Sequence, residues 1–509
     1  MAVQTVIELL SVGADSDTAI FTVDRPPLTY AGLRALVAET VASLRRLGIG
    51  RHDRVAIVLP NGPEMAAAFV AVAAGATTAP LNSGYRGEEF QFYLEDLNAK
   101  ALLVAADSDS PVIEEAHSLG IPVYQLNVVE GSPAGTFTIS AAGASPGNGA
   151  DTEEPDYAEP DDIALVLHSS GTTSRPKIVP LSQANICASA SHITEILSLT
   201  ADDRCTNIMP LFHIHGLIAA VLSSLSAGAS IYCTPGFNAL RVFAWFADAK
   251  PTWYSAVPTM HQAILARAGR NAEIVAGLNL RFIRSSSSSL PPQVMAELEE
   301  TFGCPVIESY GMTEAAHQMA SNPLPPATRK PGSVGIAAGP DVMIMDQQNN
   351  LLPAGETGEV VIRGPNITKG YENNPTANAE AFIDGWFRTG DQGVLDDEGY
   401  LRITGRLKEI INRGGEKISP REVDEVLLDH PAVAQAVTFA YPHDKLGEEV
   451  GAAIVLKEGA QASNSDIREF VAQHLADFKV PRKVIFVDEI PKGITGKLQR
   501  IGLHEKLGL

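Results

Sequence analysis

The residues most suited to chemistry stand in a short loop that begins at His168. The loop combines small and hydroxylated residues with two cations and reads His168-Ser169-Ser170-Gly171-Thr172-Thr173-Ser174-Arg175-Pro176-Lys177. Small residues leave backbone N–H groups open to a ligand, and the hydroxyls, Arg175 and Lys177 add donors and positive charge. This set suits a triphosphate, although GxxxxGK[ST], the Walker A pattern, is absent. A serine- and threonine-rich surface turn is the alternative.

Five further segments stand out, at residues 209–216, 308–314, 386–391, 405–409 and 491–497. With the loop, and in this order, they resemble the motifs of the adenylate-forming enzymes. That family comprises acyl-CoA synthetases, luciferases and carrier-protein adenylation domains. The loop departs from the family pattern at Ser174 and Ile178, where glycine is usual.

The resemblance implies that a carboxylate attacks the α-phosphate of ATP and that the acyl group then passes to a thiol. Such a reaction depends mainly on positioning and on charge neutralisation. The implied phosphate-binding residues are Ser169, Ser170, Gly171, Thr172, Thr173, Ser174, Arg175 and Lys177. Among the other nucleotide ligands, Tyr310 would lie against adenine, Asp391 would accept bonds from both ribose hydroxyls, and Arg406 would contact ribose or phosphate.

The implied catalytic residues are Thr313, Glu314 and Lys497. Thr313 would donate to the α-phosphate, and Lys497 would place its ammonium on the transferring phosphate. Glu314 and Thr172 would hold Mg²⁺, which prefers oxygen ligands. A core tyrosine at 310, a turn aspartate at 391 and a solvated surface lysine at 497 are the alternatives.

The second half-reaction involves the C-terminal region. In the family a small C-terminal domain rotates between the two half-reactions, and the resemblance places the hinge at Lys408. It also implies that Arg413, Gly414 and Gly415 shape the binding site for coenzyme A. ATP, Mg²⁺, coenzyme A and a small carboxylate are therefore the expected ligands.

Two features bear on which acid is used. Serines fill positions 285–289, where the family usually has small apolar residues, and His317 follows the adenine motif. A fatty acyl chain would leave these polar groups unpaired at a cost of roughly 1–3 kcal/mol each, whereas a short second carboxylate would pair with them. The combination resembles the oxalate–CoA ligases of plants and fungi. It implies that His213, Ser287 and His317 bind oxalate, with the choice among the five serines open, while His215 is expected to pack.

Other functions remain as alternatives. Malonate, 4-coumarate or another small or medium acid could be the substrate. The enzyme could instead transfer the acyl group to a carrier protein. A third possible class of function is that of a non-catalytic nucleotide-binding relative.

Apolar patterns predict the elements that position these residues. Helices are expected at 29–47 and 64–74, alternating with strands at 54–59, 77–81, 101–105 and 163–167, which indicates a mainly parallel, doubly wound sheet. Strands are also expected at 358–363 and 399–404, and beyond them helices at 420–428 and 465–475 and strands at 434–441 and 451–456. We expect an α/β protein with a large N-terminal domain of doubly wound sheets with helices, residues 1–405, and a small mobile α+β C-terminal domain, residues 406–509.

Composition narrows the functional classes. The net charge of −22 over 509 residues argues against general binding to nucleic acid or acidic lipid. The four cysteines form no CxxC pair, and residues 1–13 lack a secretory signal, so a cytoplasmic location is expected. The most apolar window, 65–81, is expected to be a buried helix rather than a membrane span. A monomer and a dimer both remain open.

Overall fold

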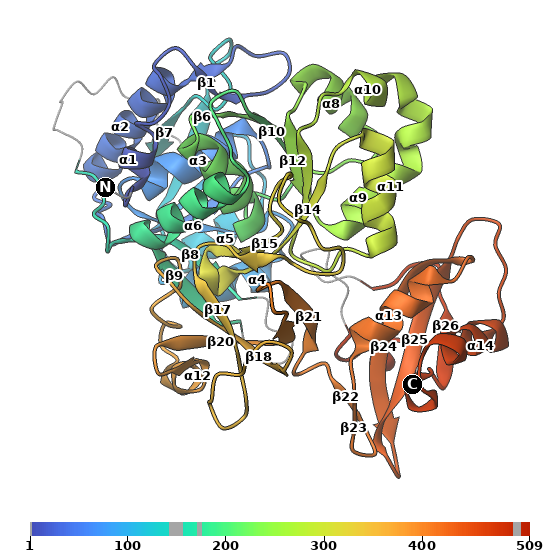
Figure 1. The fold of residues 1–509 in the computed structure, drawn as a ribbon. Helices are drawn as coiled ribbons and strands as arrows, with labels where there is room; N and C mark the ends of the chain where they lie inside the picture. The colour runs from blue at the N-terminus through green and yellow to red at the C-terminus, as the bar shows by residue number, and fades with distance from the viewer. Residues whose placement is uncertain (1–2, 142–155, 170–175, 492–499) are drawn as a thin grey trace.

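The computed structural model describes residues 3–141, 156–169, 176–491 and 500–509. Two large sheets form the body of the molecule (Figure 1). The first has the order β7-β6-β5-β3-β4-β8-β9, in which β7 and β9 are antiparallel edges of a parallel centre. Its strands are β3 (Arg54–Val58), β4 (Thr77–Pro80), β5 (Ala101–Ala105), β6 (Val123–Val128), β7 (Phe137–Ala141), β8 (Ile163–His168) and β9 (Ile178–Ser182).

The second sheet has the order β16-β15-β14-β13-β12-β10-β11-β1-β2. The run from β14 to β1 is parallel, and β15, β16 and β2 are antiparallel. Its strands are β1 (Thr18–Phe21), β2 (Leu28–Thr29), β10 (Arg204–Asn207), β11 (Ser230–Cys233), β12 (Trp253–Ala256), β13 (Phe282–Ser285), β14 (Val306–Met312), β15 (His317–Ser321) and β16 (Ile336–Ala337).

Helices pack on and between these sheets. They are α1 (Val6–Leu9), α2 (Tyr30–Arg46), α3 (Pro63–Ala73), α4 (Gly87–Asp96), α5 (Val112–Ser118), α6 (Gln183–Ile196), the π-helix η1 (His215–Leu222), α7 (Ser223–Ser226), α8 (Val242–Ala249), α9 (Pro258–Ala268), η2 (Gly269–Asn271), α10 (Ala272–Gly277), α11 (Pro292–Phe302) and η3 (Thr313–Ala315). Helix α3 contacts α2 and β4 as well as β1, β11 and η1, so it joins the two sheets.

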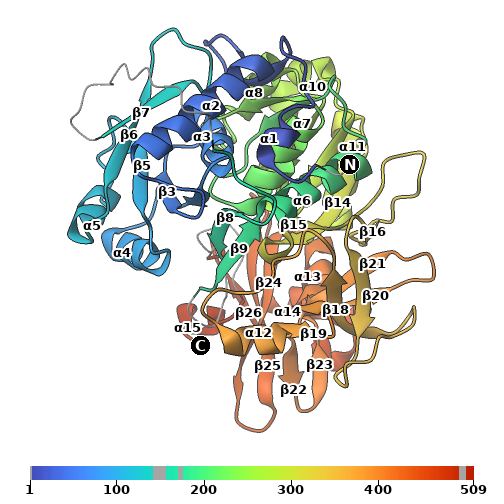
Figure 2. The ribbon, with the colours of Figure 1, turned by 90° about the vertical axis from the view of Figure 1, so that its left-hand side faces the viewer.

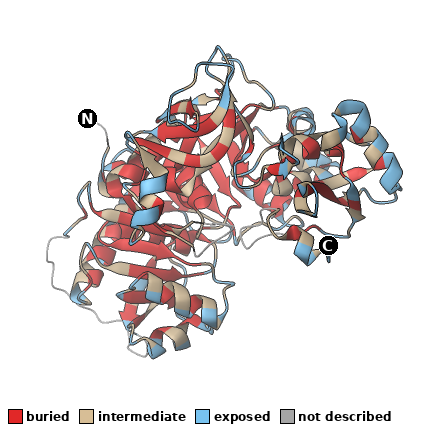
Figure 3. Ribbon diagram, turned by 90° about the horizontal axis from the view of Figure 1, so that it is seen from below, coloured by how far each residue is buried: buried red, intermediate tan, exposed pale blue. Residues whose placement is uncertain are grey.

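The apolar window at 65–81 is buried, as predicted, but it is not one helix. It contains most of α3, a turn and strand β4, and every residue from Met65 to Ala74 is almost fully buried. Figure 3 shows buried residues concentrated in the sheets and the adjoining helix faces. Within the described ranges, no helix has the length and apolarity needed to cross a bilayer.

A smaller sheet extends the N-terminal part. It consists of β17 (Asp341–Met345), β18 (Thr357–Arg363), β19 (Phe382–Ile383), β20 (Trp386–Leu395) and β21 (Leu401–Arg406), with helix α12 (Pro375–Ala381) beside it. Strand β21 ends at Arg406, one residue beyond the predicted boundary between the domains.

The C-terminal part has its own sheet and core, set apart from the two large sheets (Figure 1). Its elements are β22 (Ile411–Arg413), β23 (Glu416–Ile418), α13 (Pro420–Asp429), β24 (Val433–His443), β25 (Gly447–Leu456), α14 (Asn464–His474), η4 (Asp477–Lys479), β26 (Lys483–Phe486) and α15 (Leu503–Lys506). The predicted fold class, a large α/β domain and a small α+β domain, is confirmed. The boundary at 405/406 stays a prediction.

Candidate active site

A sharp reversal between β14 and β15 gathers several of the predicted residues. Tyr310 lies on β14, Thr313 and Glu314 form the short helix η3, and His317 begins β15. The chain turns through Ala316 and His317, whose φ angles are +47° and +96°. Residues other than glycine rarely adopt such backbone angles, and backbone strain of this kind is concentrated at functional sites. The turn also requires a glycine at 311, because a Cβ there would lie 1.8 Å from the carbonyl oxygen of His317.

Asp391 lies at the centre of a second group. Asp391 on β20 and Arg406 on β21 are direct cross-strand partners, and Arg406 Nε lies 2.9 Å from Asp391 Oδ1. The Tyr310 hydroxyl donates to Asp391 Oδ2. Burial, reinforced by the Asp391 carboxylate, raises the pKa of Tyr310, so this hydroxyl stays a donor at neutral pH. The carboxylate is 4% exposed, and the three residues come together from three strands.

Glu314 is buried and held by a residue that the sequence analysis did not select. The Tyr371 hydroxyl donates to Glu314 Oε1 at 2.8 Å, and burial together with Glu314 raises the Tyr371 pKa. The Nζ of Lys177 lies 4.3 Å from the centroid of the same ring, a cation–π distance. Lys177 and Glu314 therefore contact the same side chain, Lys177 over the ring and Glu314 at the hydroxyl. A carboxylate in this position suits Mg²⁺, which uses one or two carboxylates together with phosphate oxygens.

The predicted phosphate loop connects β8 to β9, which pair antiparallel. At its base the Ser169 N–H donates to the Lys177 carbonyl at 2.8 Å, and the Lys177 N–H donates to Ser169 Oγ at 3.1 Å. The other predicted members of the loop, Ser170, Gly171, Thr172, Thr173, Ser174 and Arg175, lie outside the described residues. The structure thus places both ends of the loop near Tyr371 and Glu314.

A group of mostly buried polar side chains lies next to the reversal between β14 and β15. We call it the polar cluster and define it as His215, Ser255, Arg284, Ser287, His317 and Gln318. His215 Nδ1 lies 3.0 Å from Ser287 Oγ, and its Nε2 lies 2.6 Å from Ser255 Oγ. The rings of His215 and His317 are 4.9 Å apart between centroids. The structure therefore brings two of the three predicted substrate residues, Ser287 and His317, to one place.

The third predicted substrate residue, His213, contacts the cluster indirectly, since its Nδ1 accepts the backbone N–H of His215 at 3.3 Å. His215 itself was expected only to pack. It is fully buried, but its ring bonds two serines and it begins the π-helix η1, an irregularity that is frequent at functional sites.

The predicted residues of the C-terminal part lie apart from the groups described above. Arg413 precedes a tight turn between β22 and β23, where Gly414 and Gly415 have φ angles of +59° and +99°, as a type I′ hairpin requires. Figures 1 and 2 both place this hairpin at the far end of the C-terminal part from β14 and β15. Lys408 is exposed just after β21. Lys497 lies outside the described residues. Arg500, three residues further along the chain, pairs with Asp424 at 2.6 Å.

Comparison with known proteins identifies the family. Residues 12–372 match the family model described as AMP-binding enzyme, and residues 422–497 match the AMP-binding enzyme C-terminal domain. The chain belongs to the AMP-binding enzyme family.

Several relatives cover nearly the whole enzyme. An oxalate–CoA ligase from Arabidopsis thaliana is 46% identical over 93% of this chain and 92% of its own length. One from Saccharomyces cerevisiae is 43% identical over 88% and 86%. The crystal structure of ATP-bound MatB from Rhodopseudomonas palustris matches with a TM-score of 0.88 and 29% identity over 99% of both chains. The predicted family and the predicted enzyme class, an AMP-forming acid–CoA ligase, are both confirmed.

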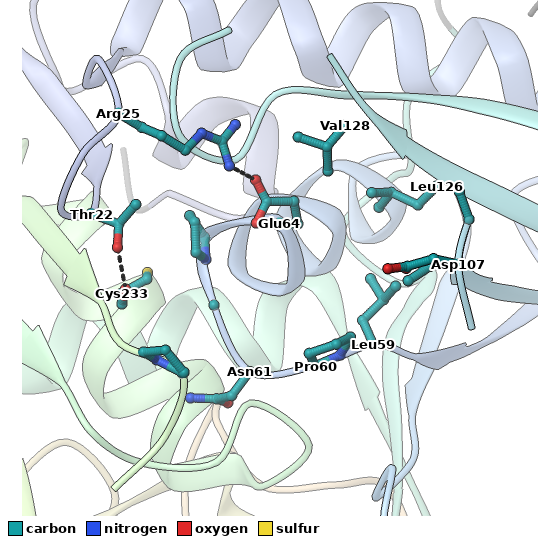
Figure 4. Close-up of a pocket in the computed structure, with 15 residues that line it drawn as sticks. Thr22, Arg25, Leu59, Pro60, Asn61, Glu64, Asp107, Leu126, Val128 and Cys233 are labelled. Atoms are coloured by element: carbon teal, nitrogen blue, oxygen red, sulfur yellow. Dashed lines mark hydrogen bonds and ion pairs between the residues drawn. The ribbon is translucent and has the colours of Figure 1, made fainter. Parts of the chain in front are cut away.

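This AMP-binding enzyme has a cavity that lies apart from the polar cluster. It has a volume of about 540 Å³ and lies at the carboxyl ends of β3 and β5. Figure 4 shows the Arg25–Glu64 ion pair and the hydrogen bond from Thr22 to Cys233 at its wall. Asn61, which also lines it, accepts the Leu211 N–H at 2.8 Å and so supports the segment that leads to His213. Of the predicted site residues that the structure describes, none lines this cavity.

Three features of the site were not predicted from the sequence: Arg284, Tyr371 and the hydrogen-bonding role of His215. Arg284 had a visible signal, since a charged residue directly follows the apolar pair Phe282-Ile283 in a strand at the centre of the sheet. No signal in the sequence pointed to Tyr371, because 57 residues separate it from Glu314 along the chain.

Proposed function

We propose that this enzyme is an oxalate–CoA ligase. It would form oxalyl-adenylate and diphosphate from oxalate and ATP, and then transfer the oxalyl group to the thiol of coenzyme A with release of AMP. The observation that carries the choice of acid is the polar cluster. It agrees with the names of the two relatives that are 46% and 43% identical.

The cluster favours a small polar acid over an apolar one. His215 and His317 are at most 1% exposed, and Ser287 bonds His215 from the segment that follows β13. An alkyl or aromatic substituent next to these groups would leave donors and acceptors unpaired, at roughly 1–3 kcal/mol each. A second carboxylate accepts hydrogen bonds from the same groups. We therefore assign oxalate to the space beside Ser287 and His317, with His213 at its edge.

The groups around β14 and β20 support the nucleotide site. Asp391 is oriented by Tyr310 and Arg406, so its oxygens are held in place for ribose hydroxyls. The Tyr310 ring is available for adenine. Glu314 lies beside Tyr371 and fits a divalent cation. Mg²⁺, when bound, would neutralise phosphate charge there, with Thr172 as a further proposed ligand.

The phosphates would lie between the ends of the loop that begins at Ser169 and the η3 helix. Thr313 would donate to the α-phosphate. Lys497 is proposed to bring its charge to the same phosphate from the C-terminal domain. Positioning and charge neutralisation of this kind account for most of the rate enhancement expected in phosphoryl and nucleotidyl transfer.

Domain rotation about Lys408 is proposed for the thiol transfer. The hairpin with Arg413, Gly414 and Gly415 is at the far end of the C-terminal part, so the domain must turn before these residues can reach a bound adenylate. The four cysteines are buried and free, which suits a reducing compartment, and we propose a cytoplasmic location.

The test is a panel of acids assayed for AMP and diphosphate release with and without coenzyme A. The panel contains oxalate, malonate, octanoate and 4-coumarate. We expect kcat/KM for oxalate to exceed that for octanoate and 4-coumarate by about 100-fold or more, since two unpaired polar groups at about 1.4 kcal/mol each correspond to that factor. A higher kcat/KM for any other acid of the panel would refute the choice of oxalate. Steady-state AMP release that is equally fast without coenzyme A would refute the thiol-transfer step, because only diphosphate belongs to the first half-reaction.

A further inference from the structure

The polar cluster contains a buried cation that has no acidic partner among the described residues. Arg284 is fully buried on β13. Its Nη2 donates to Gln318 Oε1 at 3.1 Å, and its Nη1 lies 3.3 Å from Ser255 Oγ, 3.3 Å from His317 Nε2 and 3.5 Å from His215 Nε2. Its Nε has no hydrogen-bond partner in the part of the chain that the structure describes. In the described parts of the chain, no aspartate or glutamate forms an ion pair with this guanidinium.

The charge is present at neutral pH. Burial lowers the pKa of Arg284 to about 9, which still leaves the guanidinium protonated. Cys205 lies close enough to interact, but burial raises the pKa of its thiol, so it supplies no negative charge. Arginine is only a donor, so the contact of its Nη1 with His317 requires Nε2 to be the acceptor of a neutral imidazole. Arg284 is therefore the cation of the cluster, and it also sets the tautomer of His317.

Leaving a buried charge unpaired is costly for the fold. An uncompensated ion in the interior costs several kcal/mol, and buried charges in proteins are normally paired. A purely structural side chain at the centre of a parallel sheet would be apolar or neutral. An anionic substrate group that enters the cluster would remove this cost only while it is bound.

We infer that Arg284 supplies the counter-charge for the second carboxylate of the substrate and so makes the enzyme selective for a dicarboxylate. This inference rests on the proposed function and names the residue that determines specificity at that site. Ser287 and the two imidazoles would add neutral hydrogen bonds to the same carboxylate. A monocarboxylic acid of the same shape would leave the buried guanidinium unpaired.

The test compares oxalate with oxamate, in which an amide replaces one carboxylate. For the wild-type enzyme, kcat/KM of AMP formation should be at least about 100-fold higher for oxalate. The Arg284→Gln variant should lose at least about 100-fold for oxalate and change less than about fivefold for oxamate. Arg281→Gln makes the same substitution three residues earlier, where the side chain is on the surface and pairs with Asp203. This control should keep the wild-type ratio.

A second variant tests the charge without removing the arginine. Gln318→Glu is nearly isosteric and places a carboxylate where Arg284 Nη2 now donates to an amide. The new ion pair should compete with the substrate, so kcat/KM for oxalate should fall at least about tenfold while the melting temperature stays the same or rises. This variant keeps the inference testable if Arg284→Gln does not fold.

The outcomes separate this inference from the proposed function. If the wild-type enzyme prefers another dicarboxylate, oxalate is wrong, and the same comparison with that acid and its monoamide tests Arg284. An unchanged ratio in Arg284→Gln, or full oxalate activity in Gln318→Glu, would overturn the role of Arg284. A wild-type enzyme that prefers monocarboxylates would overturn both proposals.

Discussion

Glu308 should make the stability of the N-terminal domain depend on pH. Its side chain lies on β14, is 1% exposed and accepts the Leu290 N–H at 3.0 Å through Oε1. Within the described ranges, its Oε2 has no hydrogen-bond partner. Burial raises the pKa of Glu308 from 4.5 to about 7, only partly opposed by Arg421 and the Leu290 N–H. The folded protein therefore holds this proton more tightly than the unfolded chain.

The sign and size of the effect follow from linkage. A group that binds protons better when folded makes unfolding easier as pH rises, between its unfolded and folded pKa values. For Glu308 that window runs from pH 4.5 to about 7. At 1.36 kcal/mol for each pKa unit, the full loss is about 3 kcal/mol. The variant Glu308→Gln keeps the acceptor for the Leu290 N–H and has no proton to lose.

We expect the stability of Glu308→Gln relative to wild type to increase by about 2–3 kcal/mol between pH 5 and pH 8. Other buried groups titrate in this range, but they cancel in the difference between the two proteins. Urea unfolding followed by tryptophan fluorescence suits the measurement, because Trp245, Trp253 and Trp386 all lie before residue 405.

Glu300→Gln is the matched control, since Glu300 is exposed on the neighbouring helix α11. It should change stability by less than about 0.5 kcal/mol at both pH values. A stability difference between Glu308→Gln and wild type that is the same at pH 5 and pH 8 would refute the argument, because it would mean that Glu308 ionises in the folded protein as readily as in water.

Three further predictions concern the candidate site. Asp391→Asn should lower kcat/KM for ATP by roughly 10²- to 10⁴-fold, since two charge-assisted bonds to ribose contribute about 1.5–3 kcal/mol each; a change below tenfold in steady-state kinetics would remove Asp391 from the ribose site. Lys408→Pro should slow transfer to coenzyme A far more than diphosphate release, measured separately by rapid quench, and equal losses would argue against domain rotation. Gly311→Ala should lower both the melting temperature and oxalate-dependent AMP formation, because its Cβ would meet the His317 carbonyl at 1.8 Å, whereas Gly277→Ala, where a Cβ meets nothing within 4 Å, should change neither.

Local pattern was enough to find most of the elements. Apolar runs predicted the strand at 101–105 to the residue and the helix at 29–47 to within one residue at each end, because side-chain periodicity reflects which face of an element is buried. The ordered motifs likewise identified the family, since loops that bind ATP need particular residues at fixed spacing. These features depend on short stretches of chain.

The composition of the polar cluster depended on tertiary structure. Parallel pairing of β12 with β13 sets Ser255 beside Arg284, 29 residues away in the sequence. The reversal after η3 brings His317 back against Arg284 across a separation of 33 residues. The sequence shows an arginine, two histidines and a run of serines, but their distances follow from sheet order and from the φ angle of His317. The sequence therefore determined the reaction class, while only the packed sheet decided which residue could hold an unpaired buried charge in the polar cluster.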